Sequence, residues 1–196
     1  MEIEYADRIK GLKASAIREI LKFTADPSVI SFAAGNPAPE AFPVKEIAEI
    51  TADIFANDPI AALQYSVTEG YPALRTRLKK FVREHYHIGN ESDDLIIMSG
   101  AQQGIELSCK VLCNEGDVVI CEVPSFVGSL NSFKSFNARL VGVPVENGGM
   151  NLEKLEMALR ENPRTKLIYV IPNFQNPSGT CMSLEKRKGL YDLAKK

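Results

Sequence analysis

The sequence predicts an α/β fold in which helices cover both faces of a mostly parallel sheet. In the second half of the chain, apolar runs of strand length alternate with segments whose apolar residues recur at helical spacing. The strand-length runs are almost continuously apolar, which is typical of strands buried on both faces of a parallel sheet. A hydrophobic content of 45% over 196 residues is enough to build the core that such a sheet needs.

The first ninety residues predict helices joined by irregular or extended backbone. Apolar residues near helical spacing indicate a short amphipathic arm over residues 14–24, which Ser15 is placed to cap. Prolines at 37, 39 and 43 then interrupt regular structure. Further amphipathic patterns predict helices over residues 44–56 and 70–86.

From residue 95 onward the pattern is a β/α series. The predicted strands are residues 95–98, 118–123, 139–143 and 167–171. The predicted helices are residues 101–113, 126–136, 152–160 and 183–194. Such alternation favours parallel strands connected by helices.

The same series predicts an incomplete domain. A helix over residues 183–194 has no following strand, and a sheet of four strands would leave an apolar edge unpaired, which natural domains avoid. We therefore expect a fragment of a longer polypeptide. Residues 1–42 would form an N-terminal arm and a small-domain segment, and residues 43–196 the N-terminal half of a large domain.

Composition and charge argue against several classes of protein. The net charge of −2 offers no basic footprint for DNA or RNA. No apolar run approaches the ~20 residues of a membrane-spanning helix, and the acidic start lacks the basic residues of a signal peptide. We therefore expect a cytoplasmic protein that binds neither nucleic acid nor membrane. Three of the four cysteines lie in apolar helix or strand contexts, which predicts buried thiols. No metal site is expected, because no further Cys or His pair close in sequence completes a ligand set with Cys109 and Cys113.

Three motifs follow three of the predicted strands and should meet at one edge of the sheet, where parallel sheets bind ligands. The first, Ser99-Gly100-Ala101-Gln102, joins a strand to a helix. Free N–H groups and the positive end of the helix dipole favour an anion such as phosphate there. Tight packing between strand and helix explains the small residues equally well.

The other two motifs would supply a ring and an amide. Phe126 follows the second strand and could stack on a flat heteroaromatic ring, although a lone aromatic residue is more often part of the core. Asn176 follows the last strand, in a loop where Pro172 and Pro177 fix φ, Pro177 being a candidate for a cis bond. A Pro-Gly turn in which Asn176 bonds its own backbone is the alternative. Together the three motifs suit a phosphorylated aromatic cofactor.

Five motifs, in order and spacing, resemble the N-terminal half of the fold-type-I aminotransferases, which use pyridoxal 5′-phosphate. They are Gly35-Asn36-Pro37, Tyr65 with Gly70, Leu74 and Arg75, Ser99 to Gln102, Glu122-x-Pro124-Ser125-Phe126, and Asn173-x-x-Asn176-Pro177-x-Gly179. The residues Phe174-Gln175 and the arm resemble most the subgroup that acts on 2-aminoadipate and kynurenine. Some bacterial transcription regulators share this domain.

The resemblance implies a set of cofactor contacts. The backbone N–H groups of Ala101 and Gln102, in the turn that begins at Gly100, would bind the phosphate. Phe126 would cover the pyridine ring, and Asn176 would donate to the phenolic oxygen and so lower the pKa of the imine. Tyr65 would reach the phosphate in the neighbouring subunit, which implies a homodimer; a core tyrosine is its alternative role.

Substrate contacts follow less directly. The resemblance places Gly35 and Asn176 at the site of the amino acid and the 2-oxo acid. Independently of it, Arg18 on the arm is a candidate for pairing with a distal carboxylate of the substrate, although a solvated helix charge is an equally good interpretation.

Three elements of the family have no counterpart in this sequence: the Asp that pairs with the pyridinium nitrogen, the Schiff-base Lys, and the Arg that binds the substrate α-carboxylate. Lys186, Lys188, Lys195 and Lys196 are predicted to lie on an exposed helix face. We therefore expect a parent aminotransferase and no activity from this chain alone. Two other classes are weighed: the effector domain of a transcription regulator, which would need a winged-helix domain before the arm, and a nucleotide-binding module, which would need a glycine fingerprint.

Overall fold

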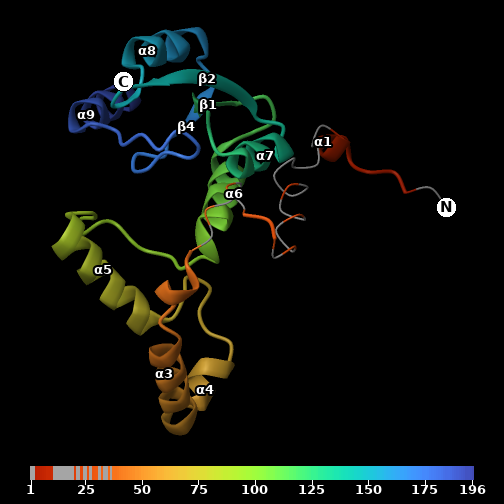
Figure 1. Ribbon diagram of the computed structural model, residues 1–196. Coiled ribbons are helices and arrows are strands. Elements are labelled where there is room, and N and C mark those ends of the chain that lie inside the picture. Colours follow the sequence, from red (N-terminus) through yellow and green to blue (C-terminus); the bar gives the residue numbers. More distant parts are fainter. Residues whose placement is uncertain are drawn as a thin grey trace. The chain divides into compact units, whose positions relative to one another are not determined.

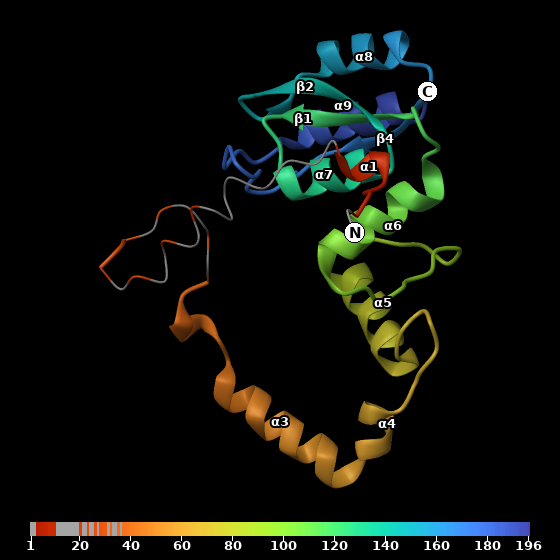
Figure 2. The ribbon, with the colours of Figure 1, turned by 90° about the vertical axis from the view of Figure 1, so that its right-hand side faces the viewer.

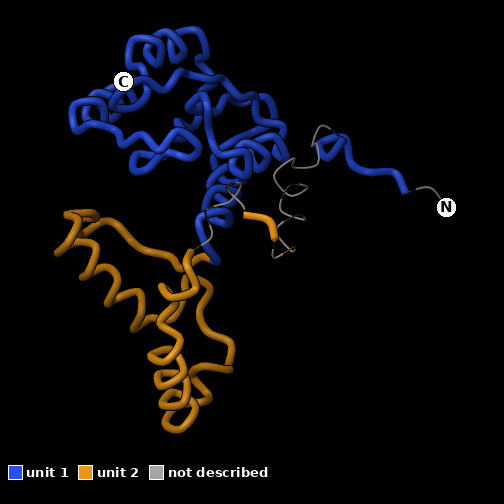
Figure 3. The backbone as a smooth tube through the Cα atoms, in the orientation of Figure 1, with its two compact units in different colours: residues 1–13, 99–196 blue, residues 14–98 orange. Residues whose placement is uncertain are grey.

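The computed structural model describes residues 3–10, 20, 23, 26, 28–30, 32, 35 and 37–196. The chain divides into two compact units (Figure 3). One, here called the sheet unit, contains residues 1–13 and 99–196; the other, the helical unit, contains residues 14–98. Each unit is described by itself.

The sheet unit is built on four strands (Figure 1). They are β1 (Val118–Val123), β2 (Arg139–Glu146), β3 (Gly149–Met150) and β4 (Thr165–Tyr169). Their order is β3-β2-β1-β4, with β1 parallel to both β2 and β4 and only the short β3 antiparallel to β2. The predicted mostly parallel sheet is therefore confirmed.

Helices cover both faces of this sheet, as predicted. On one face, α8 (Leu152–Glu161) and α9 (Leu184–Ala194) pack on Val118, Ile120 and Val143. On the other, α6 (Gly100–Leu112) and α7 (Val127–Ser135) pack on Val119 and Cys121. Figure 2 shows α8 and α7 on opposite sides of β1 and β2. Successive β1 residues thus enter opposite cores, and each fully buried Val or Ile contributes about 1.5–3 kcal/mol.

The helical unit contains the short 3₁₀ helix η2 (Pro39–Ala41) and the helices α3 (Val44–Asn57), α4 (Pro59–Leu63) and α5 (Pro72–Tyr86). The predicted helices over residues 44–56 and 70–86 are confirmed within two residues at each end. The predicted arm over residues 14–24 lies mostly outside the described residues. A further short helix, α1 (Asp7–Lys10), belongs to the sheet unit.

The predicted strand over residues 95–98 is wrong, because these residues join no ladder. Their backbone groups bind within the helical unit instead: Ile97 N donates to Glu69 O at 2.9 Å, and Arg75 Nε donates to Leu95 O at 2.6 Å. An apolar run of strand length forms a strand only where a neighbouring strand accepts its hydrogen bonds. The apolar pattern alone cannot show that such a neighbour is present.

The last strand is displaced by two residues from its prediction. It includes the polar Thr165 and Lys166, because Thr165 pairs with Val118 at the start of the central strand. It ends at Tyr169, and the backbone N–H of Ile171 donates instead to the side chain of Glu122 at 2.9 Å. The loop that follows β4 is thus tied to β1 by a carboxylate.

One prediction about organisation is not decided by this architecture. The domain boundary at residue 42 stays a prediction, because the compact units group residues by mutual contact and not by domain. Among the described helices, none is long and apolar enough to cross a membrane.

Candidate functional site

Three of the predicted cofactor motifs lie in the sheet unit, at the start of α6 and in the loops after β1 and β4. We call residues 124–126 the Phe126 loop and residues 170–182 the Asn176 loop. Both leave the carboxyl ends of neighbouring parallel strands, so they lie at the edge where such sheets bind ligands.

The first turn of α6 is open to an anion. Ser99 is its N-cap, and the Ser99 side chain makes no capping hydrogen bond. Gly100 has φ +80°, and apart from its chain neighbours and the backbone of its own helix no described atom lies within 4 Å of where its Cβ would be. The start of this thirteen-residue helix, with the positive end of its dipole, therefore has no capping bond from the Ser99 side chain, while Gln103 Oε1 accepts from Ser99 N at 2.6 Å.

The side chain of Gln102 is turned away from this opening, toward α7. Its Nε2 donates to Gly128 O at 3.3 Å and to Ser132 Oγ. Only the backbone N–H of Gln102 is left for the predicted phosphate contact.

The ring of Phe126 lies beside the same turn. A Cβ added at Gly128 would lie 2.6 Å from Phe126 Cε1 and 3.2 Å from Gln102 Oε1. The Phe126 ring and the Gln102 amide therefore both pack against Gly128. Phe126 is 37% exposed, which leaves part of its ring free to cover a ligand. The preceding hydroxyl, Ser125 Oγ, is buried without a hydrogen-bond partner among the described residues. A buried polar atom without a partner fits a site that a polar ligand completes.

The Asn176 loop is rigidly closed. The predicted cis bond at Asn176-Pro177 is confirmed, and Val123-Pro124 is cis as well. Gln175 N donates to Thr180 O at 2.9 Å, and Gln175 Oε1 accepts from Ser178 N at 2.8 Å. The amide that bonds the turn backbone is thus Gln175, whereas Asn176 is exposed at the surface of the loop.

Sequence reasoning missed two buried polar residues that support these loops. Glu122 and Gln175 are each 2% exposed, and their side chains meet at 3.3 Å. Burial raises the pKa of the Glu122 carboxyl, while hydrogen bonds from Ile171 N and Gln175 act in the opposite direction. The signals for Glu122 were its place in the motif Glu122-x-Pro124-Ser125-Phe126 and its carboxylate in the otherwise apolar strand Val118–Val123, and neither indicates its partner. Gln175 was noted only with Phe174 as part of the family resemblance, and no local pattern indicates its contact with Glu122, 53 positions earlier.

A third missed residue, Arg187 on α9, holds both ends of the Asn176 loop. Its Nη2 donates to Pro172 O at 2.8 Å and to Asn173 Oδ1 at 2.6 Å. Its Nε donates to Met182 O at 2.9 Å. An arginine in a helix of basic residues resembles a solvated charge, so its sequence context concealed this role.

One lysine prediction is wrong. Lys186 is not on an exposed face: its side chain is 19% exposed, and Nζ donates to Gly149 O at 3.0 Å. The turn before β3 passes beside α9 and covers the lysine, which the helical pattern could not show. Lys188, Lys195 and Lys196 are exposed as predicted.

The remaining predicted site residues belong to the helical unit. Tyr65 is 99% exposed. Gly35 is exposed, and apart from its own residue and chain neighbours no described atom lies within 4 Å of its Cβ position. Arg18 lies outside the described residues. The predicted contacts of all three stay predictions.

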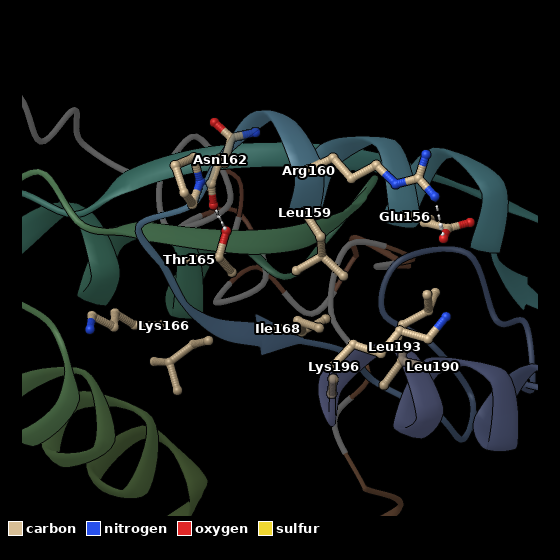
Figure 4. Close-up of a pocket in the computed structure, with 13 residues that line it drawn as sticks. Glu156, Leu159, Arg160, Asn162, Thr165, Lys166, Ile168, Leu190, Leu193 and Lys196 are labelled. Atoms are coloured by element: carbon tan, nitrogen blue, oxygen red, sulfur yellow. Dashed lines mark hydrogen bonds and ion pairs between the residues drawn. The ribbon is translucent and has the colours of Figure 1, made fainter.

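A large groove of about 820 Å³ lies elsewhere, along the free edge of β4 (Figure 4). Leu159 from α8, Ile168 from β4, and Leu190 and Leu193 from α9 form its apolar part. Because β4 is the last strand in the sheet order, its outer edge pairs with no other strand among the described residues. Asn162 and Thr165 place part of it at the amino end of β4, away from the candidate cofactor loops.

The parallel sheet, the open helix start and the two loops define a transferase fold of the type that uses pyridoxal phosphate. The chain belongs to the family described as Aminotransferase class I and II, which matches residues 27–196. The predicted cofactor is confirmed, since pyridoxal 5′-phosphate is the cofactor of these proteins.

Known relatives agree with this assignment. The chain is 40% identical over 194 residues to aromatic-amino-acid aminotransferase 1 of Thermococcus litoralis, covering 97% of this chain and 46% of that protein. It is 43% identical over 183 residues to 2-aminoadipate transaminase of Thermus thermophilus, covering 93% and 44%. The chain thus spans about half the length of the curated relatives it matches.

Solved structures show the same fold. A kynurenine aminotransferase of Pyrococcus horikoshii, in complex with PMP, superposes with a TM-score of 0.89 at 34% identity, covering 97% of this chain and 48% of that one. LysN, an alpha-aminoadipate aminotransferase of Thermus thermophilus complexed with N-(5'-phosphopyridoxyl)-L-leucine, gives 0.84 at 37% identity, covering 97% and 46%.

Proposed function

We propose that the protein containing this chain is a pyridoxal-phosphate-dependent aminotransferase that moves an amino group between an amino acid and a 2-oxo acid. The observation that carries the proposal is the grouping of three parts: the uncapped start of α6, the Phe126 ring beside it, and the Asn176 loop tied to the Phe126 loop. Membership of the aminotransferase family supports it. When bound, the cofactor supplies an electron sink for the carbanion of the substrate.

The residues of this chain would bind and orient the cofactor. The N–H groups of Ala101 and Gln102 would hold the phosphate, assisted by the helix dipole, while Gly100 allows close approach. Phe126 would cover one face of the ring. The Asn176 amide would donate to the phenolic oxygen and stabilise its deprotonated form.

The whole reaction would need more than these residues. No lysine here lies in the sequence context of the family's cofactor-binding lysine, and the chain spans about half of its relatives. We propose that activity belongs to a longer cytoplasmic polypeptide acting as a homodimer, in which Tyr65 contacts the partner's phosphate. Gly35, Asn176 and Arg18 would face the substrate.

The proposal is tested on the whole protein that contains this chain, here called the natural-length protein. It is titrated with pyridoxal phosphate and, separately, with ATP. Saturable binding of pyridoxal phosphate with a new absorbance band supports it, and binding of ATP alone would refute it. Transamination is then measured with 2-aminoadipate, kynurenine and an apolar amino acid. The 196-residue chain tested alone should show no turnover.

Arg18 is tested in the same assay. Arg18→Ala should lower the rate with 2-aminoadipate more than the rate with the apolar amino acid, because only the former carries a distal carboxylate. Arg8→Ala, an exposed arginine of α1, is the matched control. An equal loss for both substrates would contradict the role of Arg18.

A second candidate function is that of an effector domain in a transcription regulator. An uncharacterized HTH-type transcriptional regulator of Escherichia coli is 29% identical over 181 residues, covering 90% of this chain and 38% of that protein. Specific DNA binding by the natural-length protein, together with no transamination, would favour this candidate.

A further inference from the structure

Glu122 and Gln175 connect the two candidate cofactor loops through buried hydrogen bonds. Gln175, in the Asn176 loop, donates from Nε2 to the carbonyl oxygen of Pro124 in the Phe126 loop at 2.7 Å. The same nitrogen donates to Glu122 Oε2 at 3.3 Å. Glu122 Oε2 also accepts from the backbone N–H of Ile171 at 2.9 Å, at the beginning of the Asn176 loop.

Every polar atom of the Gln175 side chain takes part in a hydrogen bond. Both Nε2 hydrogens have acceptors, and Oε1 accepts from Ser178 N. The orientation of the amide is therefore fixed, because its nitrogen must face two acceptors and its oxygen one donor. At 2% exposure, each of these bonds would be costly to leave unmade.

These contacts lie next to the residues that would touch the cofactor. Gln175 directly precedes Asn176, and Pro124 stands two positions before Phe126. A movement of either loop would change the distance between the ring of Phe126 and the amide of Asn176. Hydrogen bonds that run between the loops fix that distance, whereas bonds within one loop cannot.

We propose that Glu122 and Gln175 are positioning residues that hold the Phe126 loop and the Asn176 loop as one rigid unit. The coupling of the loops follows from the hydrogen bonds within this chain and does not depend on the proposed function. Its consequence for cofactor binding rests on the proposed function. Neither residue is assigned a contact with the cofactor.

Isosteric substitutions separate hydrogen bonding from packing. Gln175→Glu keeps the shape but places a carboxylate oxygen opposite Pro124 O and Glu122, so it removes the donors. Glu122→Gln keeps a carbonyl oxygen that can accept from Ile171 N and from Gln175, so it preserves the connection. Gln175→Leu removes all of the side-chain bonds.

Arg187 provides a comparison within the same loop. Its guanidinium bonds Pro172, Asn173 and Met182, all of which belong to the Asn176 loop. Arg187→Ala should therefore loosen that loop without releasing the Phe126 loop. Val143→Ala, in the buried core of β2, serves as a general destabilising control.

The first test is hydrogen exchange of the natural-length protein without cofactor. Gln175→Leu and Gln175→Glu should raise amide exchange by about tenfold both in residues 170–182 and at residues 125–127. Glu122→Gln should leave both segments near the wild-type rate. Faster exchange in residues 170–182 alone, as expected for Arg187→Ala, would overturn the coupling. So would equal acceleration of the whole sheet unit, as expected for Val143→Ala.

The second test is the dissociation constant for pyridoxal phosphate. Gln175→Leu and Gln175→Glu should weaken binding about tenfold, while Glu122→Gln stays within about twofold of wild type. Wild-type affinity in both Gln175 variants would overturn the positioning role. If the wild-type protein bound no pyridoxal phosphate, the proposed function would fail, while the exchange result would still decide the coupling.

Discussion

The ring of Phe126 occupies the space that a side chain at Gly128 would need, since a Cβ there would lie 2.6 Å from Cε1 of the ring. Gly128→Ala should therefore displace the ring, which sits at the end of a flexible side chain. Stacking contributes about 0.5–1.5 kcal/mol, so the affinity for pyridoxal phosphate should fall about two- to tenfold. Equilibrium titration of the natural-length protein measures this.

The thermal midpoint provides the control for this substitution. Because the ring can turn toward solvent, Gly128→Ala should change the midpoint little. Val127→Ala, at the exposed neighbouring position, should alter neither quantity. Unchanged affinity in Gly128→Ala would show that the ring is not a cofactor contact.

Arg187 is expected to stabilise the sheet unit by closing the ends of the Asn176 loop. Arg187→Ala removes the arginine donor from Met182 O and Asn173 Oδ1, while Pro172 O keeps the bond from Met182 N at 2.8 Å; the loss should lower the free energy of unfolding by about 1–3 kcal/mol in urea. Arg187→Lys should recover little, because an ammonium lacks the planar fork that reaches both oxygens. Lys188→Ala, on the exposed side of the same helix, is the control and should be neutral. If Arg187→Lys restored the free energy of unfolding to that of the wild type, the positive charge alone would account for the stabilisation.

Glu122 should make stability fall as pH rises. Burial raises the pKa of this carboxyl above its ordinary value of 4.5, so the folded protein holds the proton more tightly than the unfolded chain. The stabilisation is complete below pH 4.5 and is lost as pH increases through the higher folded pKa. Glu122→Gln cannot ionise and should remove this dependence.

Urea unfolding of both proteins at pH 4, 6 and 8 measures the effect. The wild type should lose stability relative to Glu122→Gln between pH 4 and pH 8. The opposite trend would mean that the hydrogen bonds from Ile171 and Gln175 outweigh burial and lower the pKa.

The sequence predicted those parts of the fold that depend on local pattern. The near-continuous apolar run at Val118–Val123 predicted a strand, and the small residues after Ser99 predicted a helix start that favours an anion. The run at residues 95–98 has the same local character but forms no strand, because its backbone bonds to Glu69 and Arg75. The local sequence pattern does not show whether a neighbouring strand is present to pair with such a run.

The supporting residues of the site were hidden for a related reason. Gln175 and Pro124 are 51 positions apart, and their contact exists only because β1 and β4 are neighbours in the sheet. The sequence order of the strands does not give that adjacency, since β2 and β3 lie between them along the chain. Motif spacing could therefore place Phe126 and Asn176 at one edge without showing what fixes their separation.

Asp117 should produce a pH dependence opposite to that of Glu122, at the other end of the same strands. The Asp117 carboxylate accepts two hydrogen bonds: Asn114 N donates to Oδ2 at 2.8 Å, and Arg164 Nε donates to Oδ1 at 2.9 Å. The bond from Asn114, and to a smaller extent that from Arg164, lowers the pKa of Asp117 below its ordinary value of 3.8. A lowered folded pKa gives stability that is present above pH 3.8 and is lost as pH falls through the folded value. Asp117→Asn should therefore be less stable than wild type at pH 7, and the difference should shrink between pH 4 and pH 2.

Cofactor affinity distinguishes this residue from the loop residues. Asp117 precedes β1, and Arg164 precedes β4, so their ion pair joins the amino ends of the two strands whose carboxyl ends carry the candidate site. Asp117→Asn should lower stability and leave the affinity for pyridoxal phosphate unchanged at pH 7, where enough protein remains folded. Asp192→Asn, an exposed carboxylate on α9, is the control for a change of one charge. A loss of affinity in Asp117→Asn as large as in Gln175→Leu would mean that the strands transmit any disturbance to the loops, and the specific role of Gln175 would then fail.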